Sequence, residues 1–122
     1  MPLISVITAT YNSQDYIKEM IGSILNQSLK DFELIIVDDG SVDDTVKRIR
    51  PFVKADVRIK LIESEHRGSS AAKNVALKEA QGKYIAVTDA DDISYSRRLE
   101  VEYDYLEDNP EVGLIGSYFD YI

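Results

Sequence analysis

Residues 34–41 read LIIVDDGS, an aliphatic run that passes directly into a polar turn. Its first half is aliphatic at every position, as expected of a strand that is covered by helices on both faces. Its second half is polar, and aspartate followed by glycine is typical of a turn that ends a strand. The stretch therefore predicts a strand of a parallel sheet with carboxylates at its carboxyl end.

Working outward, short β-branched runs alternate with segments of helical spacing along the whole chain. The runs that predict strands cover residues 4–8, 32–37, 57–62, 84–88 and 112–118. This alternation predicts a Rossmann-like α/β fold, with a mostly parallel sheet and helices on both faces. No repeat, low-complexity tract or linker divides the chain, so we expect one domain over residues 1–122.

Four helices are expected between these strands. The first has an apolar stripe at i, i+3, i+4, i+7 and i+8, formed by Ile17, Met20, Ile21, Ile24 and Leu25. The others are expected over residues 43–50, over residues 70–80 and before Pro110. Pro51 is expected to end or kink the second helix, because proline lacks the amide hydrogen that the helix interior requires.

Composition restricts the possible partners and the compartment. The formal net charge of −8 disfavours nucleic acid or an anionic membrane surface as the main partner. The absence of cysteine excludes disulfides and thiolate metal sites, and it suits a reducing cytoplasm. No signal peptide or membrane-spanning run is evident, so we expect a cytoplasmic chain whose membrane association would require sequence outside it.

Polar clusters follow three of the predicted strands, at residues 9–12, 38–41 and 89–92. In a parallel sheet the carboxyl ends of the strands share one edge, so we expect five carboxylates to face one crevice. A divalent cation such as Mn²⁺ or Mg²⁺, together with a diphosphate, would offset their repulsion. Asp89 and Asp91 are two residues apart, which places both side chains on one side if strand geometry persists.

Each cluster alone also fits ordinary turn chemistry. Gly40 would adopt a positive φ and Ser41 would cap the next helix, while residues 89–92 could form a solvated loop. The coincidence of three such clusters at corresponding strand ends favours a ligand site.

The chain resembles the family 2 glycosyltransferases, which have the GT-A fold, over essentially its whole length. The resemblance rests on five segments in order: SVITATYN (5–12), LIIVDDGS (34–41), RGSSAAKN (67–74), GKYI (82–85) and DADD (89–92). It implies binding of a nucleotide-diphosphate sugar, a UDP-sugar in particular, and transfer of the sugar with inversion to an acceptor hydroxyl. The acceptor would be a saccharide, a lipid carrier or a protein, as in polysaccharide or cell-wall biosynthesis.

The resemblance also implies roles for individual residues. Thr10 and Tyr11 would lie against the base and ribose, and Asp39 would accept a hydrogen bond from the base. Arg67 and Lys73 would approach the base or the diphosphate.

The segment 89–92 corresponds to the Asp-x-Asp element of the family. Asp89 and Ala90 would contact the nucleotide sugar, with Asp89 also near the metal. Asp91 is expected to be the direct metal ligand, supported by Asp92.

The chain departs from the family pattern at several positions. Ala9 replaces a usual proline, His66 a frequent asparagine and Lys73 a frequent arginine; the lysine keeps the charge but loses the bidentate fork. We give the lone His66 no part in the mechanism. The general base of this family lies well downstream of the Asp-x-Asp element, and we assign it to none of the late carboxylates. We therefore expect a fragment that ends before the acceptor-binding part.

Three other classes of protein are considered. A phosphoacceptor receiver domain is disfavoured, because it requires an acidic pair after the first strand and a lysine after the last, whereas Lys83 is the final lysine here. A nucleotidyltransferase is disfavoured because residues 8–16 contain no glycine and no basic residue. A non-catalytic nucleotide-sugar-binding domain would keep the same residues and remains open.

Overall fold

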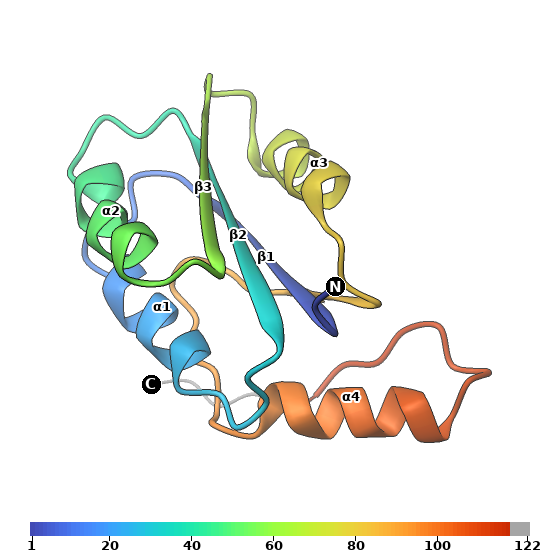
Figure 1. Ribbon diagram of the computed structural model, residues 1–122. Coiled ribbons are helices and arrows are strands. Elements are labelled where there is room, and N and C mark those ends of the chain that lie inside the picture. The colour runs from blue at the N-terminus through green and yellow to red at the C-terminus, as the bar shows by residue number, and fades with distance from the viewer. Residues whose placement is uncertain (118–122) are drawn as a thin grey trace.

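The computed structural model describes residues 1–117. One parallel four-stranded sheet in the order β3-β2-β1-β4 forms the centre of this part of the chain (Figure 1). The elements in chain order are β1 (Ile4–Thr10), α1 (Ile17–Leu25), β2 (Phe32–Asp39), α2 (Thr45–Ala55), β3 (Ile59–Ser64), α3 (Ser69–Glu79), β4 (Tyr84–Val87) and α4 (Arg98–Asp108). The predicted α/β fold with a parallel sheet is confirmed.

Helices cover both faces of the sheet, with α1 and α2 on one side and α3 on the other (Figure 1). One core joins the sheet to α1, α2 and α4 through buried residues that include Val6, Ile21, Leu34, Ile36, Ile49 and Leu99. A second, smaller core lies under α3 and consists of Ile7, Ile35, Val37, Ala72 and Ala76. All eight residues of β2 are buried, which explains the uninterrupted aliphatic run at its centre, residues 34–37.

The register of the strands aligns their carboxyl ends. Thr10, the last residue of β1, pairs with Asp38 of β2, and Val87, the last residue of β4, pairs with Ile7. Thr88 continues this alignment, because its amide donates to the Ile7 carbonyl at 3.0 Å. The segments that follow β1, β2 and β4 therefore begin at one edge, which we call the carboxyl edge of the sheet.

Of the two outcomes expected at Pro51, an end or a kink of the second helix, the end does not occur. The helix continues through Pro51 to Ala55. Ile49 before the proline is fully buried, and Phe52 and Val53 after it pack against the same core. Apolar packing on both sides of Pro51 therefore outweighs the roughly 3 kcal/mol that an interior proline costs a helix.

The fifth predicted strand does not form over residues 112–117, and Tyr118 lies outside the described residues. Gly113 and Gly116 supply no side chains for a sheet surface. Leu114 is 90% exposed, so the segment is not packed on a core. No helix within the described part of the chain is long and apolar enough to span a bilayer.

Candidate functional site

An acidic turn, residues 89–92, lies at the carboxyl edge of the sheet. Asp89, Asp91 and Asp92 are exposed, and carboxylate oxygens from all three lie within 4.8 Å of one another. The Asp92 amide donates to the Asp89 carbonyl at 3.1 Å, which closes a turn. Strand geometry, which was expected from sequence to place Asp89 and Asp91 on one side, does not persist, because β4 ends at Val87. The turn brings the aspartates together instead.

Ala90 anchors this turn. It is 8% exposed and packs in the core beneath the face that α1 covers, whereas the aspartates on either side of it face solvent. Burying the small side chain between charged neighbours directs the carboxylates outward, because charged groups are costly to desolvate.

The five-carboxylate crevice expected from sequence does not form in the described structure. Asp38 is buried and accepts hydrogen bonds from the amide and the hydroxyl of Ser41, at 2.9 and 2.6 Å. Gly40 has the predicted positive φ of 78°, but Ser41 bonds to Asp38 instead of capping α2. Backbone and hydroxyl donors therefore satisfy Asp38, and only the three aspartates of the acidic turn cluster.

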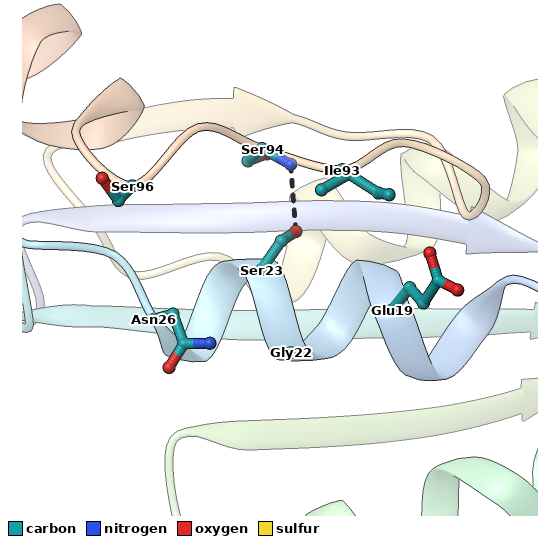
Figure 2. Close-up of a pocket in the computed structure, with 7 residues that line it drawn as sticks. All are labelled: Glu19, Gly22, Ser23, Asn26, Ile93, Ser94 and Ser96. Atoms are coloured by element: carbon teal, nitrogen blue, oxygen red, sulfur yellow. Dashed lines mark hydrogen bonds between the residues drawn. The ribbon is translucent and has the colours of Figure 1, made fainter. Parts of the chain in front are cut away.

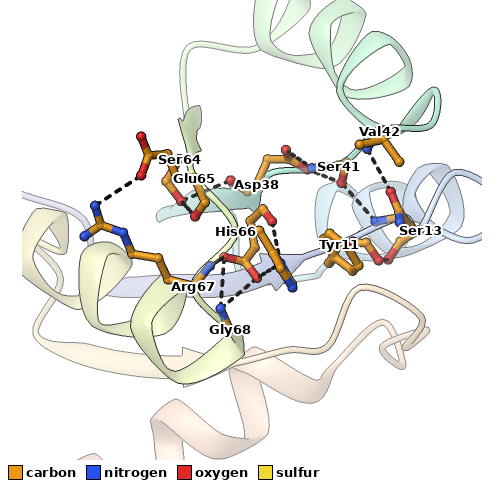
Figure 3. Close-up of polar contacts among 12 residues, drawn as sticks. Tyr11, Ser13, Asp38, Ser41, Val42, Ser64, Glu65, His66, Arg67 and Gly68 are labelled. Carbon is orange, nitrogen blue, oxygen red and sulfur yellow. Dashed lines mark hydrogen bonds and ion pairs between the residues drawn. The ribbon is translucent and has the colours of Figure 1, made fainter.

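Asp39 is also buried, and its carboxylate is contacted by donors from three residues that Figure 3 labels, His66, Arg67 and Gly68. The amides of Arg67 and Gly68 donate at 2.8 and 3.0 Å, and Nδ1 of His66 lies 2.8 Å from Oδ2. The Arg67 amide, followed by the Gly68 amide and the His66 ring, outweighs burial and holds the pKa of Asp39 below its usual range. Asp39 is therefore an ionised group that fixes the loop before α3.

His66 has a larger role than the sequence suggested. Its ring stacks on Tyr11 with centroids 4.2 Å apart and an angle of 25° between the planes. Gly40 allows this approach, because a Cβ at that position would lie 2.8 Å from the His66 amide nitrogen. The nearest sequence signal is the glycine of the DDG segment, whose partner could not be identified without the fold.

The loops after β1 and β2 hold Tyr11 in place. The Asn12 amide donates to the Ser41 hydroxyl at 2.9 Å, and the Val42 amide donates to the Asn12 side chain, also at 2.9 Å. Asn12 has a positive φ of 48°, a conformation that asparagine tolerates better than most residues. Tyr11, His66 and Asp39 thus form one cluster, which we call the aromatic–carboxylate cluster.

The two predicted basic residues differ in position. Nζ of Lys73 lies 3.8 Å from Oδ1 of Asp89, so α3 brings this lysine to the acidic turn. The guanidinium of Arg67 is exposed and lies 3.4 Å from Glu65, while its backbone amide binds Asp39. Lys73 thus reaches Asp89 through its side chain, whereas Arg67 contacts Asp39 through its main chain.

Thr10 leaves a hydrogen-bonding group unused at this edge. The residue is 1% exposed, and within residues 1–117 its Oγ1 is the one buried side-chain oxygen or nitrogen without a hydrogen-bond partner. Buried hydroxyls without partners are uncommon, and those found in native structures call for an explanation.

The donor set at the acidic turn suits a hard divalent cation. Mg²⁺ and Mn²⁺ prefer carboxylate oxygens and are usually bound by one or two carboxylates together with phosphate oxygens and water. Within the described chain, residues 89, 91 and 92 are the one group of three or more potential ligands close enough to share an ion. These residues therefore fit Mn²⁺ or Mg²⁺.

A separate groove of about 410 Å³ lies between α1 and residues 93–96 (Figure 2). It is lined by Glu19, Gly22, Ser23, Asn26, Ile93, Ser94 and Ser96. None of the predicted site residues lines it, so it is distinct from the ligand site predicted at the carboxyl edge.

A parallel α/β domain with these groups at its carboxyl edge has the architecture of a nucleotide-binding domain. The sequence profile of glycosyl transferase family 2 matches residues 5–122. The chain therefore belongs to the family 2 glycosyltransferases.

Individual relatives agree with this assignment. A glycosyltransferase of Methanocaldococcus jannaschii without a characterised activity is 43% identical over 99% of the chain, which covers 43% of that protein. TuaG of Bacillus subtilis, a glycosyltransferase provisionally assigned to teichuronic acid biosynthesis, is 42% identical over 86% of the chain and 42% of its own length. The chain thus spans less than half the length of these relatives.

Solved structures show the GT-A fold. Residues 1–349 of TarS from S. aureus, in complex with UDP-GlcNAc, match 88% of the chain with a TM-score of 0.81 and 31% identity, over 32% of that structure. The mannosyltransferase PcManGT from Pyrobaculum calidifontis, in complex with GDP-Man and Mn²⁺, matches 88% of the chain with a TM-score of 0.80 and 32% identity, over 33% of that structure.

Proposed function

We propose that this chain binds a nucleotide-diphosphate sugar, UDP-linked in particular, together with Mn²⁺ or Mg²⁺, for transfer of the sugar to an acceptor hydroxyl with inversion. The observation that carries the proposal is the position of the acidic turn. It lies at the same sheet edge as the aromatic–carboxylate cluster, so the proposed site for cation and diphosphate would adjoin the proposed site for a nucleoside. TarS binds UDP-GlcNAc and PcManGT binds GDP-Man with Mn²⁺, which supports a nucleotide sugar and a divalent cation as the ligands.

The nucleoside would bind at the aromatic–carboxylate cluster. Tyr11 would offer an aromatic surface to the base or ribose, and Thr10 beside it carries a buried hydroxyl without a partner. Asp39 would contribute to recognition of the base. Its carboxylate also fixes the turn that contains Arg67, whose exposed side chain, paired with Glu65, would approach the nucleotide.

The diphosphate and cation would bind at the acidic turn. Asp91 would be the direct metal ligand, with Asp89 and Asp92 beside it, and Asp89 and Ala90 would border the sugar nucleotide. Lys73 would add positive charge next to Asp89, where the phosphates approach. When bound, the cation supplies stabilisation of negative charge on the departing diphosphate. The group that deprotonates the acceptor is assigned to no described residue.

The acceptor class and compartment are also proposals. The assignment of TuaG favours a saccharide hydroxyl of a growing cell-envelope polysaccharide over a lipid-carrier or protein acceptor. The absence of cysteine suits the reducing cytoplasm, where we place the reaction.

The proposal is tested by calorimetric titration of UDP into the 122-residue chain with and without Mn²⁺, after circular dichroism has shown that the chain is folded. GDP and ADP serve as control nucleotides. Manganese-dependent binding of UDP in preference to ADP supports the proposal, and stronger binding of GDP would reassign the base. A folded chain that binds none of the nucleotides with Mn²⁺ present would overturn the donor site.

A further inference from the structure

Arg98, the first residue of α4, brackets the acidic turn. Its guanidinium contacts Val87 and Thr88, which precede the turn, and Ser94, which follows it. Nη2 donates to the Val87 carbonyl at 3.0 Å, and Nη1 donates to the Thr88 hydroxyl at 2.6 Å. Nη1 also donates to the Ser94 hydroxyl at 3.2 Å. One side chain therefore joins the two ends of the segment that contains Asp89, Asp91 and Asp92.

The guanidinium is itself held in place. Its Nε donates to Glu102 one turn later in α4, at 3.3 Å, and both side chains are largely shielded from solvent, at 22% and 19% exposure. A planar guanidinium with its donors fixed in a fork can bind several acceptors at once, which a lysine ammonium at the same place could not reproduce. The geometry therefore depends on arginine and not on positive charge alone.

The start of α4 is fixed by α1 and the residues just after it. Gln27 is fully buried, and its side chain makes two hydrogen bonds to this region. Its Nε2 donates to the Tyr95 carbonyl at 2.7 Å, and its Oε1 accepts from the Leu99 main-chain amide at 3.0 Å. The Ser94 amide donates to the Ser23 hydroxyl at 3.0 Å, across the groove beside α1 (Figure 2). Arg98 thus extends from a rigid support toward the turn.

On the first side of the turn, Thr88 is held by the sheet. Its amide donates to the Ile7 carbonyl at 3.0 Å, and the Thr8 hydroxyl donates to its carbonyl. Its own hydroxyl is buried and is bound by Arg98. The guanidinium therefore connects the fixed end of β4 to the fixed start of α4, with the three aspartates between them.

We propose that Arg98 is a positioning residue for the cation and diphosphate site, and this inference rests on the proposed function. Three carboxylates within 4.8 Å repel one another, and this repulsion opposes the spacing that a shared cation requires. Bonds from Arg98 to residues 87, 88 and 94 counter that repulsion and keep the aspartates at ligand spacing. Residues that orient metal ligands typically contribute about 10- to 100-fold to metal affinity.

The test compares Arg98→Ala and Arg98→Lys with a matched control, Arg97→Ala. Arg97 is the preceding arginine, but it is exposed and pairs only with Glu100 at 2.8 Å among the bonds seen. Three quantities are measured on each folded variant: Mn²⁺ affinity by electron paramagnetic resonance, the affinity for uridine by NMR titration, and the melting temperature. Uridine has no phosphates, so its binding reports on the nucleoside end alone.

We expect Arg98→Ala to weaken Mn²⁺ binding about 10- to 100-fold. Arg98→Lys should be nearly as weak, because it keeps the charge but loses the fork. Uridine affinity should change less than about twofold in both, and Arg97→Ala should match the unmodified chain in all three quantities. A merely structural role would instead lower uridine affinity and melting temperature together with Mn²⁺ affinity.

Unchanged Mn²⁺ affinity in a folded Arg98→Ala variant would overturn the inference, as would full rescue by lysine. These results differ from a failure of the proposed function. In that case the unmodified chain itself would bind neither Mn²⁺ at the acidic turn nor UDP, whatever the residue at position 98.

Discussion

Glu33 at the amino end of β2 and the acidic turn at the carboxyl edge of the sheet carry the same kind of charge in opposite surroundings. The Glu33 side chain is 8% exposed and is bound by the Ser5 hydroxyl at 2.6 Å, the Gln81 amide at 2.7 Å and Lys60 at 3.3 Å. The three aspartates of the acidic turn are exposed and close together. At one end carboxylate charge is used to hold the fold, and at the other it is left available to a ligand.

The pKa of Glu33 follows from its surroundings. Burial alone would raise it, but hydrogen bonds from Ser5 and Gln81, with Lys60 nearby, outweigh burial and hold the pKa below its usual value of 4.5. The Ser5 hydroxyl also accepts from the Gly82 amide at 2.8 Å, so Glu33 ties the approach to β4 to both central strands. A carboxylate whose hydrogen-bonding capacity is fully used stabilises the fold. The exposed, clustered carboxylates of the acidic turn are instead the ligands proposed for a cation.

The largest effect that would sharpen this comparison is expected from Asp91→Ala. Removing the proposed direct ligand should weaken manganese-dependent UDP binding more than about 100-fold, since even residues that only orient ligands contribute about 10- to 100-fold. Folding stability should be unchanged or slightly higher, because a repelling charge is removed. Calorimetry with Mn²⁺ checks the first expectation and urea unfolding the second. Asp104→Ala, on the exposed surface of α4, controls for the change in net charge; an Asp91→Ala variant with unchanged manganese dependence would disprove the metal assignment.

The opposite result is expected from Glu33→Ala. The variant leaves the Gln81 amide and the Ser5 hydroxyl without their acceptor, which should lower the free energy of unfolding by about 3 kcal/mol. Mn²⁺ affinity of the folded protein should stay within about twofold of the unmodified chain. Glu63→Ala is the control, because its exposed pair with Arg50 at 3.1 Å should contribute less than about 1 kcal/mol. Equal destabilisation by the two variants would show that burial of Glu33 has no special role.

Asp39→Ala probes a carboxylate that lies between these extremes, since it is saturated but belongs to the proposed nucleoside site. Losing the acceptor of the Arg67 and Gly68 amides should loosen the loop that carries His66. We expect UDP to bind about 10-fold more weakly, equal to about 1.4 kcal/mol, with its manganese dependence retained. Titrations of UDP at several Mn²⁺ concentrations separate the two effects. Loss of the manganese dependence itself would place Asp39 in the metal site.

The smallest expected effect is on how the free energy of unfolding changes as the pH falls. Because the pKa of Glu33 is depressed in the folded protein, its stabilisation is fully present above the usual pKa of 4.5 and is lost as the pH falls through the lower folded value. Glu33→Gln removes this titration, so its unfolding free energy should fall less steeply than that of the unmodified chain between pH 7 and about pH 3. Urea unfolding across this range measures the two slopes. Parallel slopes would mean that Glu33 is not the group whose protonation weakens the fold in acid.

Much of the fold was predictable because local patterns encode it. An uninterrupted aliphatic run in residues 34–37 and the helical stripe from Ile17 reflect the side-chain periods of strand and helix, and these periods hold wherever the element is placed. Polar turn residues that directly follow the apolar strands, such as those of residues 38–41 and 89–92, likewise predicted where the strands end. The expectation failed where a local rule met tertiary packing, as at Pro51, and where a strand-like run lacked burial, as at residues 112–117.

The α/β class, the family and the position of the acidic turn could be predicted from sequence, because each depends on residues close together in the chain. Which carboxylates lack hydrogen-bonding partners depends instead on tertiary packing. Asp38 and Asp39 are satisfied by hydrogen bonds, the latter to residues 27 to 29 positions away, and Arg98 reaches its role by joining segments that the turn separates. Hydrogen-bond partners of this kind are set by the packing of distant strands and helices, and no local period records them.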